Sequence, residues 1–162
     1  MMFEMAARNG VRLGHGSVRE LREANDFADL QSFLDLYYEG TQVLLYERDF
    51  YELTWAYLKK ASSQGVRHAE IFFDPQAHTD RGVNLGTVIT GLRRALEEGE
   101  RRLSMSSHLI LCFLRHLSAG EAMETLRQAL PYKEWIVGVG LDRIELQRLD
   151  TTGTFPLGHV VE

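Results

Sequence analysis

Three short apolar runs alternate with longer segments of helical periodicity over the second half of the chain, and this alternation limits the possible folds most strongly. The runs are "VRHAEIFF", "HLILCFLR" and "WIVGVGLD", which end at about residues 73, 114 and 142. Short apolar runs rich in β-branched and aromatic residues are typical of strands buried on both faces. Helices are predicted between them, over 84–103 and 119–130. A β-α-β-α-β order gives right-handed crossovers, so the sequence predicts an α/β fold with a parallel sheet.

Local signals define the ends of these helices. Ser118 and Glu121 have the spacing of a capping box, in which a side chain and the main chain satisfy each other's hydrogen bonds at a helix start. Pro131 is expected to close the same helix, and the preceding helix is expected to begin near Asn84. The crossover helices of the parallel sheet are therefore well delimited.

The first half of the chain predicts additional helices before the sheet. Apolar residues recur at spacings of three and four between Phe27 and Tyr38, with Asp26 as a candidate N-cap and Gly40 as a candidate C-cap. A second helix is expected over residues 48–65. The start of the chain is polar, and "LGHGS" (residues 13–17) has the composition of a loop. We therefore expect two helices before the first strand.

A polar cluster follows the first predicted strand in "FFDPQAHTDRGV". The ends of the three strands bring Asp74, Arg115 or His116, and Asp142 to one edge of the sheet. Parallel α/β folds bind ligands at this edge, because loops and helix N-termini converge there. Asp80 and Arg81 are expected to hydrogen-bond within their own loop, with Gly82 at a positive φ.

Metal ligands are not apparent from histidine spacing. No two of the six histidines are two or four residues apart, so no pair is placed on one face of a strand or helix. His78 and His116 could still meet from neighbouring loops, with Asp74 or Asp142 as an oxygen ligand. The alternative is that these are solvated loop residues, and the sequence leaves both open.

Composition excludes several other classes of protein. The net charge of −5 comes without a basic stripe, so nucleic-acid binding is not expected. No apolar run approaches the roughly 20 residues that span a bilayer, and no signal peptide is evident, so a cytoplasmic location is expected. The single Cys112 is expected to be a buried small residue. A flavodoxin-like module has the same β-α-β-α-β order, but the loop "DPQAHTDRG" lacks the Ser, Thr and Gly richness of a phosphate site.

Five segments together resemble the adenosine/adenine deaminase family. They are "FLDLYYEG", "DFYELTWAYLKK", "FFDPQAHTDRGV", "LCFLRHLS" and "VGVGLD", and they occur in the family's order from about residue 1 to 142. The third segment is similar to the adenine-type branch. The resemblance implies part of a (β/α)8 TIM barrel, in which zinc activates a water that attacks C6 of adenine. The products would be hypoxanthine and ammonia.

The resemblance covers only the middle part of such a barrel. The family's His-x-His zinc pair precedes the matching segment, and its "HAGE"-type motif with the catalytic glutamate follows it. No catalytic residue and no metal ligand is therefore assigned, and this chain is expected to hold no zinc and to be inactive alone. The resemblance implies that Asp74, Gln76 and Asp142 line what remains of the adenine pocket.

The end of the chain departs from the family. We expect a partial deaminase-like domain over residues 1–145 and a divergent tail over 146–162. Arg143 and Ile144 stand where the adenine branch has two serines, and the larger Arg143 is expected to crowd the purine.

A second function also remains open. A partial barrel has open sheet edges, so the chain could be a non-catalytic interaction module that self-associates or pairs with another chain.

Overall fold

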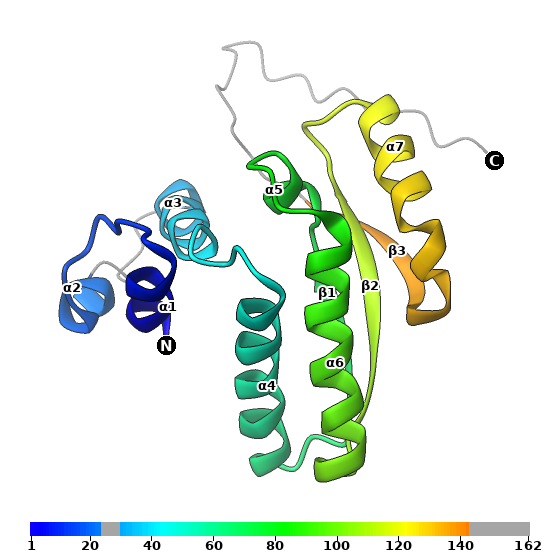
Figure 1. The fold of residues 1–162 in the computed structure, drawn as a ribbon, viewed down its shortest axis with the longest axis horizontal. Coiled ribbons are helices and arrows are strands. Elements are labelled where there is room, and N and C mark those ends of the chain that lie inside the picture. The colour runs from blue at the N-terminus through cyan, green and yellow to red at the C-terminus, as the bar shows by residue number, and fades with distance from the viewer. Residues whose placement is uncertain (24–29, 143–162) are drawn as a thin grey trace.

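The computed structural model describes residues 1–23 and 30–142, and its centre is a three-stranded parallel sheet (Figure 1). The strands are β1 (His68–Phe73), β2 (Ser106–Leu114) and β3 (Ile136–Asp142), in the order β1-β2-β3. β2 pairs with both neighbours, so Phe73 lies opposite Leu111, and Leu114 lies opposite Asp142. The parallel α/β sheet predicted from the alternating runs is confirmed.

The crossover helices begin where the sequence indicated. α6 (Leu85–Leu103) follows Asn84, whose side chain accepts a hydrogen bond from Gly86 N. α7 (Ala119–Ala129) has the expected capping box between Ser118 and Glu121. Pro131 does not end α7 directly, because α7 gives way at Leu130 to a 3-10 helix, η1 (Leu130–Trp135).

Four helices precede the sheet in the described part of the chain: α1 (Met2–Asn9), α2 (Val18–Glu23), α3 (Leu30–Thr41) and α4 (Glu47–Ser63). The expectation of two helices missed α1 and α2, which have only eight and six residues. Helices this short fall below the window of about 11–18 residues over which a helical period can be recognised. Gly40 is not a C-cap, since α3 continues through it to Thr41. The expected N-cap Asp26 and the apolar Phe27 lie outside the described residues.

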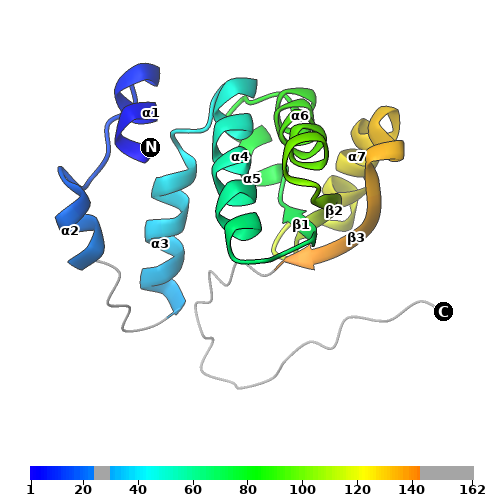
Figure 2. The same ribbon diagram turned by 90° about the horizontal axis from the view of Figure 1, so that it is seen from below.

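The core lies between one face of the sheet and the helices (Figure 2). α4 and α6 lie side by side over this face, and their close approach depends on Gly91, where a Cβ would come within 2.5 Å of Glu47 O. The opposite face remains uncovered in the described residues, and Phe72 is 65% exposed. The expectation that β1 is buried on both faces is therefore wrong, because helices cover only one of them.

Asp49 anchors α1 to the start of α4. Its side chain has no exposed surface, and Oδ2 accepts hydrogen bonds from Tyr46 N at 2.9 Å, Leu45 N at 3.1 Å and Asn9 Nδ2 at 2.7 Å. Oδ1 pairs with the guanidinium of Arg8. Burial would raise the pKa of Asp49, but these hydrogen bonds outweigh it and hold the pKa below its ordinary value. The buried carboxylate is therefore ionised and fully engaged.

No helix among the described residues is long and apolar enough to cross a membrane.

Candidate functional site

The carboxyl ends of the three strands form one edge of the sheet. Asp74 follows β1 directly and leads through Pro75 into a single helical turn, α5 (Gln76–Thr79). Asp142 is the last residue of β3, and its main chain lies opposite Leu114 of β2. The exposed Arg115 and His116 follow β2 in a turn. The structure therefore brings the predicted residues to the same edge.

Gln76 connects the loop after β1 to the end of β2. Its side chain is only 3% exposed, and its Oε1 accepts a 2.8 Å hydrogen bond from Leu114 N. Because Leu114 is the last residue of β2, this bond fixes the loop against the point where β2 leaves the sheet. The oxygen of Gln76 therefore holds the site together rather than pointing into solvent.

Replacing Gln76 with Leu is expected to destabilise the chain by about 1–3 kcal/mol, because the buried N–H of Leu114 loses its acceptor. Urea unfolding followed by circular dichroism measures this difference. Gln128→Leu is the matched control, since Gln128 is exposed on α7, where its amide donates to Glu124. We expect the control to change stability by less than about 0.5 kcal/mol. Equal effects of the two variants would contradict the role of Gln76.

Arg81 links the same loop to α3. Its Nε donates to Ala77 O at 3.2 Å, as expected for a residue that shapes its own loop. Its guanidinium also donates to Thr41 O at 2.9 Å and to Leu44 O at 2.8 Å, at and just beyond the end of α3. A cation is favourable at a helix C-terminus, where main-chain carbonyls are left without partners. Sequence spacing gave no signal of this contact, because the partners are about forty residues apart.

His78 lies beneath this arginine and is not a solvated loop residue. Its ring packs edge-on against Phe50 at 4.9 Å, and its Nδ1 lies 2.6 Å from Arg81 Nη2. Arg81 can only donate, so Nδ1 accepts and the imidazole is neutral. Burial lowers the pKa of His78 to about 4, and the charge of Arg81 acts in the same direction.

His78 is therefore expected to make the fold sensitive to mild acid. A folded-state pKa of about 4 lies below the ordinary value near 6.5, so the unfolded chain binds more protons between these values. The stability that neutral His78 contributes is fully present above about pH 6.5. It is lost as the pH falls toward 4, and the free energy of unfolding decreases by up to about 1.4 kcal/mol per pH unit.

Urea unfolding at several pH values tests this effect. We expect His78→Gln to flatten the slope between pH 4 and 6.5, whatever its effect on stability at pH 7. His116→Gln, at an exposed position, is expected to keep the slope of the parent. An unchanged slope in His78→Gln would show that His78 does not titrate as its burial requires.

The described residues do not assemble a metal centre. No three His, Cys, Asp or Glu side chains come close enough within residues 1–23 and 30–142 to hold a metal ion together. His78 is buried and bonded to Arg81, whereas His116 is exposed. This part of the chain therefore does not fit a zinc ion, and the meeting of these two histidines is not found.

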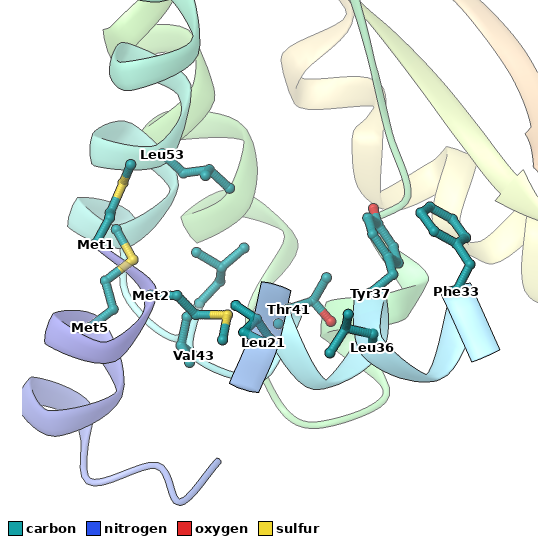
Figure 3. A pocket seen from close by; sticks show the side chains of 12 residues that line it. Met1, Met2, Met5, Leu21, Phe33, Leu36, Tyr37, Thr41, Val43 and Leu53 are labelled. Carbon is teal, nitrogen blue, oxygen red and sulfur yellow. The ribbon is translucent and has the colours of Figure 1, made fainter. Parts of the chain in front are cut away.

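A large apolar cavity lies away from the strand ends. It measures about 430 Å³ and is lined by residues of α1, α2, α3 and α4, including Met2, Leu21 and Leu36 (Figure 3). A smaller groove of about 230 Å³ extends along β1 to Asp74 and His78. The groove is the one that reaches the candidate site, so we associate it, and not the larger cavity, with the predicted chemistry.

The family model of adenosine deaminase matches residues 1–155. The chain is 60% identical over 146 residues to adenine deaminase from Hahella chejuensis and 59% identical over 146 residues to that from Chlorobium phaeobacteroides. Each match covers 90% of this chain and 44% of the relative. The chain thus spans less than half the length of these curated relatives.

Solved structures agree with the sequence matches. The crystal structure of adenine deaminase from Arthrobacter aurescens superposes with a TM-score of 0.83 at 50% identity, over 87% of this chain and 43% of that one. An amidohydrolase from Burkholderia ambifaria, solved with bound Zn, gives a TM-score of 0.74 at 20% identity, over 91% of this chain and 41% of that one. At this identity the likeness supports a shared fold and no shared activity. The open sheet corresponds to part of a TIM barrel, and the chain belongs to the adenosine deaminase family.

Proposed function

We propose that this chain supplies part of the barrel of an adenine deaminase, which converts adenine and water to hypoxanthine and ammonia. The observation that carries the proposal is the 60% identity to the Hahella chejuensis adenine deaminase over 146 residues. The structural likeness to the Arthrobacter aurescens enzyme supports it, since the same elements superpose at 50% identity. The substrate is adenine in this proposal because both of these relatives are adenine deaminases.

Three residues at the strand ends are proposed for the adenine pocket. Asp74 borders the groove beside β1, and Asp142 ends β3, so both occupy the edge where parallel α/β folds bind ligands. Gln76 is proposed to position this edge, because its Oε1 is already bonded to Leu114 N. Arg143 and Ile144, which replace two serines of the adenine branch, lie outside the described residues.

The chain by itself is proposed to bind no zinc and to be inactive. Supporting this, the described residues bring no three potential metal ligands together. The test is zinc analysis of the purified 162-residue chain together with a spectrophotometric assay of adenine conversion to hypoxanthine. We expect zinc well below one equivalent and a rate indistinguishable from the blank.

The control for this assay is the Hahella chejuensis adenine deaminase, measured in the same buffer at equal protein concentration. It establishes the sensitivity of the zinc analysis and of the rate measurement. Stoichiometric zinc and turnover by the 162-residue chain would refute the proposed inactivity while leaving the family role intact.

A cytoplasmic location and a domain boundary near residue 145 stay predictions, and the family match extends further, to residue 155.

A second candidate function is a non-catalytic interaction module. It is favoured by the two sheet edges that stay open within the described residues, β1 on one side and β3 on the other. Open edges expose N–H and C=O groups that can pair with another chain. Sedimentation velocity distinguishes this candidate, since a stable monomer at high concentration would contradict it.

A further inference from the structure

The loop after β1 is one hydrogen-bonded unit that runs from Pro75 to Val83. Pro75 O accepts hydrogen bonds from His78 N at 2.9 Å and from Thr79 N at 2.8 Å, and His78 O accepts one from Val83 N at 3.2 Å. Pro75 is buried and follows Asp74 directly in the chain. Because the unit is bonded throughout, the points at which it is fixed to the rest of the fold also determine where Asp74 lies.

Two polar contacts fix this unit to distant parts of the chain. At its start, Gln76 Oε1 accepts a 2.8 Å hydrogen bond from Leu114 N at the end of β2. At its other end, Arg81 Nη2 donates to Thr41 O at 2.9 Å and to Leu44 O at 2.8 Å. A single hydrogen bond fixes one point and leaves the loop free to rotate about it. The contact of Arg81 therefore sets the orientation of the loop.

The planar guanidinium of Arg81 is suited to this contact. Its Nε donates to Ala77 O within the loop at 3.2 Å, whereas its Nη1 donates to Gln42 O at 3.3 Å, just beyond the end of α3. Nη2 lies 2.6 Å from His78 Nδ1 and also reaches the carbonyls of α3. A lysine ammonium is a single compact charge, so it cannot reach acceptors on both sides at once. The bridge therefore requires arginine and not merely a positive charge.

We propose that Arg81 is a positioning residue of the adenine pocket, and that it acts by orienting the loop that carries Asp74 and Gln76. This inference rests on the proposed function, which places these two residues at the pocket. Both are proposed to line the pocket and not to react. A misplaced loop is therefore expected to weaken adenine binding, which raises KM and leaves kcat nearly unchanged.

Hydrogen exchange of the 162-residue chain tests the positioning without an enzyme assay. The N–H of Leu114 is the reporter, because its acceptor is the side chain of Gln76. The N–H of Leu111 is the reference, since Leu111 is fully buried in β2 between both neighbouring strands. In Arg81→Lys we expect exchange at Leu114 to accelerate at least about tenfold more than exchange at Leu111. Arg81→Gln repeats the test if Arg81→Lys does not fold.

Arg127→Lys is the matched control, because Arg127 is exposed on α7, where it pairs with Glu124 at 3.2 Å. We expect it to leave both exchange rates as in the parent chain. Far-ultraviolet circular dichroism verifies that each variant is folded. The proposal is overturned if the Arg81 variant leaves Leu114 unchanged, or if Leu114 and Leu111 accelerate equally, since equal changes report only a general loss of stability.

Kinetics test the consequence for adenine in a chimera, in which residues 1–142 of this chain replace the matched segment of the Hahella chejuensis adenine deaminase. Arg81→Lys is expected to raise KM at least about tenfold, with kcat within about twofold. Bound zinc is expected to stay the same, because this chain is proposed to supply no zinc ligand. An unchanged KM, or a loss confined to kcat, would overturn the role of Arg81 in the pocket.

The two measurements separate this inference from the proposed function. A chimera that keeps Arg81 and does not act on adenine would contradict the deaminase proposal. The exchange rates of Leu114 and Leu111 would still decide whether Arg81 positions the loop.

Discussion

A chimera in which residues 1–142 of this chain replace the matched segment of the Hahella chejuensis adenine deaminase is expected to deaminate adenine. The aligned region that contains this segment is 60% identical over 146 residues, and the same elements superpose on the Arthrobacter aurescens enzyme. In the chimera both edges of the sheet would be covered by the rest of the barrel. We expect kcat/KM within about tenfold of the parent enzyme, equivalent to about 1.4 kcal/mol. The 162-residue chain assayed beside it is expected to show no turnover.

The chimera also tests the residues proposed for the pocket. Asp74→Ala and Asp142→Ala are each expected to lower kcat/KM by at least about tenfold. Asp80→Ala is the control, since Asp80 is exposed in the loop after α5, and we expect it to stay within about twofold of the chimera. The segment taken from this chain ends at Asp142, so the chimera does not contain Arg143, which is expected to crowd the purine. A chimera that folds and binds zinc but does not act on adenine would contradict the proposed function.

Asp49→Ala is expected to destabilise the chain by about 3–5 kcal/mol, a larger loss than that expected for Gln76→Leu. The substitution leaves Arg8 without its buried partner and removes the acceptor from Tyr46 N, Leu45 N and Asn9 Nδ2. Domains of this size commonly have net stabilities of about 5–15 kcal/mol, so α1 would come loose or the whole fold would open. Hydrogen exchange of α1 detects its local release from the fold, and urea unfolding measures the loss of stability of the whole chain.

Glu52→Ala is the matched control for Asp49→Ala. Glu52 also pairs with Arg8, at 2.9 Å, but its side chain is partly exposed, and such pairs contribute about 0–1 kcal/mol. The folded-state pKa of Asp49 lies below its unfolded value near 3.8. The stability it contributes is therefore present above about pH 4 and is lost as the pH falls through the lower folded value. Equal losses in the two variants would show that burial of Asp49 is not decisive.

The candidate site was partly predictable from the sequence. Asp74 and Asp142 follow apolar strands, and parallel strands place their carboxyl ends at one edge, so local pattern and topology were sufficient to bring them together. The role of Gln76 was not predictable, because it depends on a hydrogen bond to Leu114, 38 residues further along the chain. The burial of His78 beneath Arg81 depends in the same way on how α5 packs against α3 and α4.

The sequence by itself determined the type and order of the central elements, because strand and helix periods and caps such as that of Ser118 and Glu121 are local properties of a few neighbouring residues. Only the tertiary structure decided which faces are covered. The apolar character of Phe72 and Val139 indicated burial, yet both are exposed, because the helices that the structure describes cover only part of the sheet. The anchor between Arg8 and Asp49 likewise joins residues 41 positions apart, and no local pattern encodes such a contact.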